Sequence, residues 1–108
     1  MRLLNREEIR HKQARQETFA LLLFTPFCGT CKLAERMLQI IMELSAGQLA
    51  ICRANINTMP DVAQSWQVQS VPCLLVFSQG REVKRFYALQ SVDYLYQQLR
   101  PYWENENG

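Results

Sequence analysis

Two cysteines separated by two residues are the most chemically distinctive feature of this 108-residue chain. Cys28 and Cys31 follow an apolar run at residues 19–24 and precede a long amphipathic segment. This pattern places both thiols at the start of a helix, where residues three apart lie roughly 5–6 Å from each other. A disulfide needs a Cα separation of about 4.4–6.8 Å. The pair can therefore form and open a disulfide with little backbone movement.

The first cysteine of the pair has surroundings that favour its thiolate. The N–H groups in the first turn of a helix have no helical partner, and the positive end of the helix dipole lies there. Lys32 and Arg36 add positive charge. We therefore expect the pKa of Cys28 to lie below the value of about 8.5 of a free thiol. Cys28 is the expected nucleophile, and Cys31, one turn into the helix, is the expected buried resolving thiol.

Two other interpretations of the cysteine pair are less favoured: ligands of zinc or of an iron–sulfur cluster, and inert members of the core. A zinc site would need two more ligands, and Cys52, Cys73 and His11 are available, but none forms a second closely spaced pair. The cysteines could also be inert members of the core, although Gly29 and Thr30 between them suit a turn better than a core. The redox interpretation is favoured, and it requires neither a metal nor another cofactor.

The composition predicts one globular domain covering residues 1–108. Apolar residues make up 48% and charged residues 20%, and the net charge of +2 is too small to indicate nucleic-acid binding. The longest apolar run, residues 19–24, is too short to span a membrane, and the polar segment after Met1 does not resemble a signal peptide. We therefore expect a cytoplasmic protein, where a Cys-x-x-Cys is more often catalytic or metal-binding than a structural disulfide.

Hydrophobic periodicity predicts alternating helices and strands around the cysteines. Helices are expected at residues 5–16, with a capping box from Asn5 and Glu8, at 29–45, near Trp66, and from Val92 to Leu99. Strands are expected at residues 19–24, 49–56, 73–77 and 82–87, the last two forming a hairpin. The first two strands, joined by a helix, should be parallel. The fold class is therefore α/β with a mixed sheet flanked by helices, and Pro101 should end or kink the last helix.

Three features together resemble the thioredoxin family. Residues 25–32, TPFCGTCK, resemble its active-site loop, usually Trp-Cys-Gly-Pro-Cys-Lys. Val71-Pro72 before a buried strand resembles its cis-proline loop, and Gly80 falls at the hairpin turn. The resemblance covers residues 19–99. It implies a thioredoxin-like fold with four strands, or five if residues 2–4 cover the edge formed by residues 49–56.

The resemblance also implies a function and a wider site. It implies a thiol–disulfide oxidoreductase acting on disulfide-containing protein substrates, with electrons from a reductase or a low-molecular-weight thiol. Phe27, Gly29 and Thr30 would form the active-site loop. Val71 would pair its backbone with an extended substrate segment, and Pro72 would be cis, which is a rare form that usually marks a required geometry.

The departures from the family pattern suggest altered redox chemistry. Phe27 replaces the usual Trp, and Thr30 replaces Pro, so that the Thr30 backbone N–H could donate to the Cys28 thiolate and make the pair less reducing. Leu22 stands where the family has a buried Asp that helps the resolving thiol lose its proton. Arg53, where a Lys is common, is a candidate for tuning the thiols, either extended to solvent or leaning toward the cysteines.

Two questions remain open, one about turnover and one about Cys73. Without the acid, resolution of mixed disulfides should be slow, and the alternative function is a thioredoxin-fold binding or adaptor module with little turnover. Cys73, next to Pro72, is either a small buried hydrophobe or a third redox-active thiol. Cys52 is expected in the core.

Overall fold

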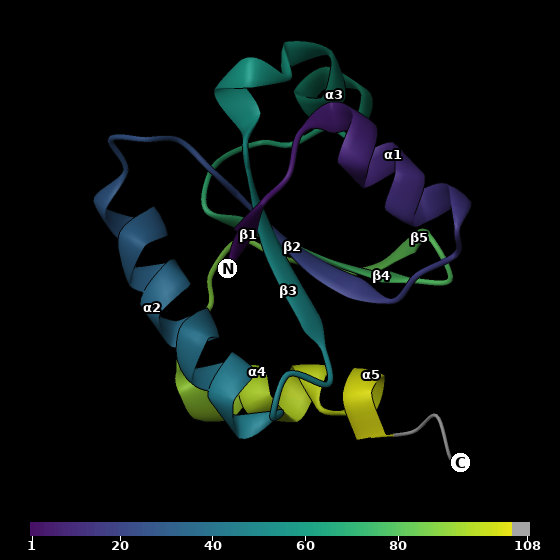
Figure 1. Cartoon of the computed structure of the whole chain (residues 1–108). Coiled ribbons are helices and arrows are strands. Elements are labelled where there is room, and N and C mark those ends of the chain that lie inside the picture. Colours follow the sequence, from purple (N-terminus) through teal and green to yellow (C-terminus); the bar gives the residue numbers. More distant parts are fainter. Residues whose placement is uncertain (105–108) are drawn as a thin grey trace.

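A five-stranded mixed sheet organises the chain in the computed structural model, which describes residues 1–104 (Figure 1). The strand order is β1-β3-β2-β4-β5. β3 runs parallel to its neighbours β1 and β2, whereas β4 is antiparallel to β2 and β5. In chain order the elements are β1 (Arg2–Leu3), α1 (Arg6–Ala14), β2 (Phe19–Phe24), α2 (Gly29–Leu44), β3 (Ala50–Asn55), η1 (Ile56–Thr58), α3 (Pro60–Ser65), β4 (Cys73–Ser78), β5 (Arg81–Phe86), α4 (Val92–Leu99) and α5 (Pro101–Glu104).

The central strands β2 and β4 are buried on both faces. Phe19 to Leu23 in β2 and Cys73 to Phe77 in β4 are buried without interruption. Strands of this kind have continuous apolar sequences, because helices cover both sides of the sheet. Figure 1 shows α1 and α3 on one face and α2, α4 and α5 on the other. The sequence prediction of a mixed sheet flanked by helices is confirmed.

Alternate residues of each strand divide the core into two layers. Leu21 and Leu23 pack in the layer that contains Ile9 of α1 and Val62 of α3. Leu22 packs in the opposite layer, with residues of α2, α4 and α5. This division follows from the two-residue period of a strand, and it determines which side chains of the sheet lie beside the cysteine-bearing helix α2.

The outer edge of β3 is covered by β1, so the four-stranded version of the prediction was wrong. Arg2 and Leu3 pair with Cys52 and Arg53, and the Leu4 N–H donates to the Arg53 carbonyl at 2.8 Å. The Leu4 side chain is buried in the core. The segment before α1 is short, yet two paired residues are enough to occupy the edge.

The ends of the helices follow the local sequence. Asn5 and Glu8 form the predicted capping box of α1. Helix α4 ends at Leu99, as expected from Pro101, but Pro101 then begins a further turn, α5, which was not predicted. Proline is well suited to the first helical position because its missing N–H would have no partner there. Trp103 of α5 is buried against the core.

The β4–β5 turn fits tightly against the end of α1. Gly80 has a φ of +79°, and an added Cβ would overlap the backbone carbonyl oxygen of Gln13. The Gly80 N–H donates to the Glu17 carbonyl at 3.0 Å. Only glycine accommodates both the left-handed backbone and this close approach.

Candidate redox site

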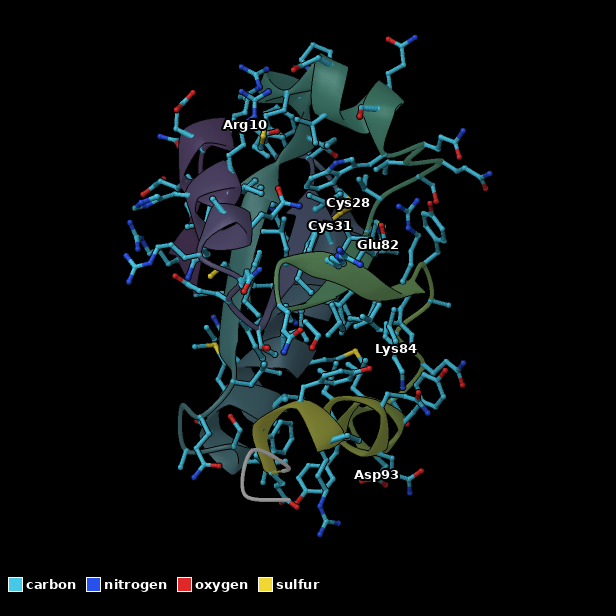
Figure 2. The ribbon with its side chains drawn as sticks, turned by 90° about the vertical axis from the view of Figure 1, so that its right-hand side faces the viewer. Arg10, Cys28, Cys31, Glu82, Lys84 and Asp93 are labelled. Atoms are coloured by element: carbon cyan, nitrogen blue, oxygen red, sulfur yellow. A yellow bond between two sulfur atoms is a disulfide. The ribbon has the colours of Figure 1, made fainter. Side chains whose placement is uncertain are left out.

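Cys28 and Cys31 lie together at the N-terminus of α2 (Figure 2). Their Cα atoms are 5.2 Å apart, and their sulfur atoms are at disulfide-bonding distance. Cys28 is the N-cap residue, and its Sγ accepts a hydrogen bond of 3.1 Å from the Cys31 N–H. Cys28 is half-buried, whereas Cys31 is only 2% exposed. The pair thus has one sulfur that is partly open to solvent and one that the helix shields.

The loop around Cys28 is open to solvent. Phe27 is 100% exposed, and Gly29 and Thr30 are also exposed. The Thr30 hydroxyl lies 3.3 Å from the Cys28 Sγ. The sequence predicts that the Thr30 backbone N–H faces the thiolate, but the observed contacts come from the Thr30 hydroxyl and from the Cys31 N–H. A thiolate can only accept hydrogen bonds, so both groups would donate to it.

The first turn of α2 carries no acidic residue. The helix dipole and the two donors at the Cys28 sulfur therefore act on a thiolate without opposition from a carboxylate in that turn. Lys32 and Arg36 are exposed on α2 and add positive charge.

Val71-Pro72 reaches the same region from a distant part of the sequence. The Val71-Pro72 peptide bond is cis, and both residues are half-buried immediately before β4. Pro72 and Thr30 line one groove of about 350 Å³. Its other lining residues belong to α2 and to the segment after β5, namely Leu33, Ala34, Met37, Tyr87, Ala88, Leu89 and Gln90. The groove brings the cysteine loop and the proline loop together.

Arg85 and Tyr87 hold the segment that leads to this proline loop, and the sequence analysis missed them. Arg85 binds Glu82 through two hydrogen bonds of 2.7 and 2.8 Å, which raise the pKa of the Arg85 guanidinium. Its Nη1 donates to the Gln67 carbonyl at 3.3 Å and to the Tyr87 hydroxyl at 3.1 Å. The Gln69 N–H donates to the same hydroxyl at 3.2 Å. The two-residue spacing of Arg85 and Tyr87 within the strand predicted at residues 82–87 was the signal that could have revealed the pair.

Arg53 is engaged with groups other than the cysteines. It lies on the α2 side of the sheet with its side chain about one-third exposed, and its guanidinium is 5.3 Å from the centre of the Phe24 ring. Its Nε donates to the Met1 carbonyl at 3.4 Å, and its Nη1 lies 3.9 Å from Glu35. Within residues 1–104 no hydrogen bond joins Arg53 to either redox cysteine. Its charge is therefore shared with Glu35, one turn beyond Cys31, rather than directed at a sulfur.

Leu22 and Cys73 point to opposite faces of the sheet. Leu22 is fully buried, lies opposite Arg53 in register and packs in the layer under α2. Cys73 is also fully buried, but it packs in the other layer, and burial raises the pKa of its thiol to about 11. Although Cys73 follows Pro72 directly, it faces away from α2. This placement favours the hydrophobic role over a third redox thiol, and Cys52 is buried in the same layer as Cys73.

The described residues offer neither a metal-binding cluster nor a membrane-spanning helix. Within residues 1–104, no three His, Cys, Asp or Glu side chains are placed to hold a metal ion. In the same residues, no helix combines the length and the apolar character needed to cross a bilayer.

Comparisons with known proteins agree with this geometry. The sequence profile of the family Thioredoxin matches residues 3–101. The chain is 40% identical over 100 residues to the thioredoxin-like protein YusE of Bacillus subtilis, covering 93% of this chain and 92% of that protein. It is 35% identical over 75 residues to a thioredoxin of Chlamydia trachomatis, covering 67% and 70% of the two chains. The oxidised thioredoxin of Plasmodium falciparum has the same fold, with a TM-score of 0.80, 15% identity and coverage of 95% and 98%.

The sheet topology and the cysteine pair at a helix N-terminus define a thioredoxin-fold protein of the general thiol–disulfide oxidoreductase class. The profile match and the relative at 40% identity then make the assignment specific: the chain belongs to the thioredoxin family.

Proposed function

We propose that this protein reduces disulfide bonds in protein substrates through a mixed disulfide at Cys28 that Cys31 resolves. The observation that carries the proposal is the pairing of a half-buried Cys28 with a buried Cys31, 5.2 Å away between Cα atoms, beside the cis Val71-Pro72 bond. An accessible thiol followed by a shielded one suits a two-step exchange, because substrate meets only the first.

The exchange proceeds through two sulfur displacements. The Cys28 thiolate attacks one sulfur of the substrate disulfide, that S–S bond breaks, and the other substrate sulfur leaves as a thiolate that takes a proton. Cys31 then loses its proton and attacks the Cys28 sulfur. The Cys28–Cys31 disulfide forms, and the substrate leaves with two thiols. A reductase or a low-molecular-weight thiol supplies the two electrons that restore the protein.

The residues around the pair would bind the substrate. The fully exposed ring of Phe27 offers an apolar contact, and Gly29 leaves open space above the loop, since an added Cβ would meet nothing within 4 Å. Val71 would pair its backbone with an extended substrate segment, and Pro72 would hold that backbone in place beside Thr30. The groove that Thr30 and Pro72 share supports this arrangement.

An insulin-reduction assay with dithiothreitol tests the proposal. The wild-type protein should accelerate insulin precipitation, Cys28→Ser should not, and Cys31→Ser should accumulate a stable mixed disulfide. Equal rates for the wild type and Cys28→Ser would contradict turnover at this site. That result would favour the alternative, an adaptor module, for which the fully buried Leu22 in place of an acid is the supporting observation.

Leu22 should also slow the second displacement. Its apolar side chain gives Cys31 no local base, so we expect Leu22→Asp to speed the resolution of a preformed mixed disulfide in stopped-flow measurements. Leu22→Asn is the matched control, because it has a similar shape but cannot accept the proton. If Leu22→Asp resolves the mixed disulfide no faster than Leu22→Asn, the missing base is not what limits this step.

The cytoplasm is the proposed location. The cysteines outside the redox pair, Cys52 and Cys73, are unpaired and buried, which fits a compartment where thiols are kept reduced.

A further inference from the structure

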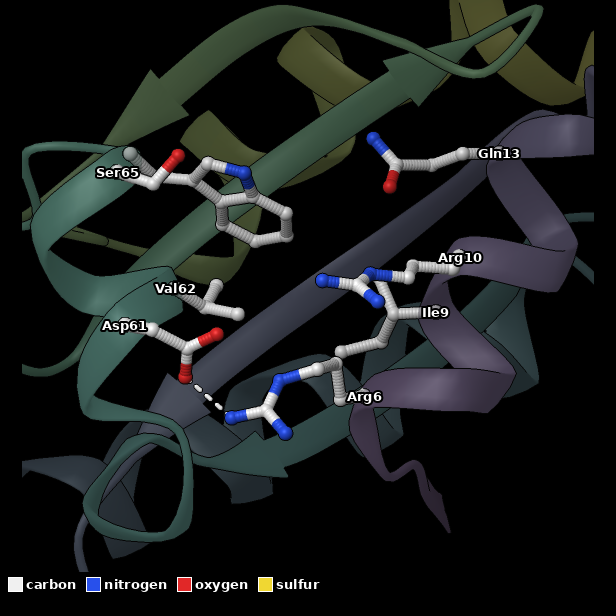
Figure 3. A pocket seen from close by; sticks show the side chains of 8 residues that line it. Arg6, Ile9, Arg10, Gln13, Asp61, Val62 and Ser65 are labelled. Carbon is white, nitrogen blue, oxygen red and sulfur yellow. Dashed lines mark hydrogen bonds and ion pairs between the residues drawn. The ribbon is translucent and has the colours of Figure 1, made fainter.

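A second pocket lies between α1 and α3, on the sheet face opposite the one that α2 covers (Figure 3). Its volume is about 350 Å³, which reaches the lower part of the range for small-molecule sites. The lining residues are Arg6, Ile9, Arg10, Gln13, Asp61, Val62, Ser65 and Trp66. None of them belongs to the redox site, so a ligand bound here would not contact the residues of disulfide exchange.

The pocket carries more positive than negative charge. Arg6 and Arg10 face a single carboxylate, Asp61, and that carboxylate is paired with the terminal nitrogen of Arg6. The Arg6 Nε is buried and has no hydrogen-bond partner within the described residues. Arg10 forms no ion pair within residues 1–104, and Figure 3 shows its guanidinium reaching from α1 toward α3. The Arg10 guanidinium therefore remains available to an anion.

The other part of the pocket is apolar. Ile9 is 2% exposed and Val62 is 9% exposed, so both form a floor continuous with the core. Trp66 is half-buried beside them and offers a flat aromatic surface. Gln13, whose amide also points into the space in Figure 3, adds a polar group near Arg10. A ligand that satisfies the whole pocket needs an anionic end and a flat apolar body.

We propose that the α1–α3 pocket binds a small aromatic carboxylate, with the carboxylate on Arg10 and the ring against Trp66. A guanidinium binds a carboxylate through two parallel N–H···O bonds, and an indole stacks on a flat ring in an offset arrangement. Arg6, which is paired with Asp61, adds positive charge at the same end of the pocket. An inorganic anion would use only the arginine end, and a neutral aromatic molecule would use only the floor.

The two tryptophans of the chain make a direct test possible. Trp66 lines the pocket, whereas Trp103 is buried in the opposite core layer. In ¹H–¹⁵N spectra, titration with 2-naphthoate should move the indole N–H signal of Trp66 and leave that of Trp103 in place. The neutral 2-naphthamide and inorganic phosphate should each bind at least tenfold more weakly than 2-naphthoate. Equal binding of phosphate and 2-naphthoate would overturn the proposal, as would shifts confined to residues around Cys28.

Charge variants complete the test. Arg10→Ala should raise the dissociation constant of 2-naphthoate at least tenfold, because Arg10 is exposed and makes no ion pair that the fold needs. Arg36→Ala is the matched control, since Arg36 is an exposed arginine on α2, outside the pocket. Arg10→Ala should also retain wild-type insulin reduction, which separates this site from the redox site. Unchanged binding in Arg10→Ala, or an equal loss in Arg36→Ala, would refute the assignment.

Discussion

The hydroxyl of Thr30 should make the reduction potential of the cysteine pair less negative. It lies 3.3 Å from the Cys28 sulfur, and it can donate a hydrogen bond to the thiolate of the reduced protein. In the oxidised protein the sulfur is neutral and accepts a much weaker bond. The hydroxyl therefore stabilises the reduced form, and replacing Thr30 by valine, which has the same shape without the donor, should make the pair more reducing.

The size of the effect follows from the exposure of the contact. A hydrogen bond to a charged group contributes about 1.5–3 kcal/mol when protected, and a neutral one about 0.5–1.5 kcal/mol. Thr30 is exposed, and water competes for the thiolate, so about 1 kcal/mol is the reasonable value. For a two-electron couple, about 1.4 kcal/mol corresponds to about 30 mV. We therefore expect Thr30→Val to shift the potential by roughly 20 mV toward more negative values.

Redox equilibration against glutathione buffers, with the two forms separated after thiol alkylation, measures this shift. Thr30→Ser is the control, because it keeps the hydroxyl and should keep the potential. Thr30→Pro, which restores the usual family residue, should also give a more negative value. The reasoning is refuted if Thr30→Val leaves the potential unchanged or makes it less negative, or if Thr30→Ser shifts it as far as valine does.

Three further predictions concern the framework of the site. Gly80→Ala should lower the free energy of unfolding by at least about 2 kcal/mol in urea titrations, because alanine is strained at positive φ and would overlap Gln13; Gly29→Ala, where nothing lies within 4 Å, should be nearly neutral. Tyr87→Phe should speed hydrogen exchange at the Gln69 amide and slow insulin reduction severalfold, and unchanged exchange would show that the hydroxyl does not hold the loop. Burial raises the pKa of Cys73 to about 11, so the unfolded chain loses this proton first as the pH rises. Stability should therefore fall between about pH 9 and pH 11, by up to about 1.4 kcal/mol per pH unit, and a Cys73→Ala variant that shows the same fall would contradict this cause.

The central part of the fold was predictable because its signals are local. The apolar run of β2, the periodicity of α2 and the turn at Gly80 each come from neighbouring residues whose physical preferences agree. The cysteine pair was likewise visible, since its spacing and its place before a helix are both sequence properties. The face on which Cys73 packs could be derived only after the register of β4 against β2 was known.

The parts of the structure that the sequence left open or did not reveal depend on contacts between distant segments. The pairing of β1 with β3 involves two residues, too few to produce a periodic pattern. The hydrogen bonds that join Arg85 and Tyr87 to the loop before Val71 depend on where β5 runs relative to that loop. The engagement of Arg53 with Glu35 requires the packing of α2 on the sheet. Each of these is a tertiary arrangement that single-residue preferences do not encode.

The edge strand β1 has a consequence for the order in which the molecule assembles. Arg2 and Leu3 are synthesised well before their partners, Cys52 and Arg53. During synthesis β1 therefore stays unpaired while β2 and α2 are made. Because closing so large a loop for two residues of ladder is entropically unfavourable until the rest of the sheet exists, β1 should join late. β1 would then reach its native place after strands that are synthesised later than it.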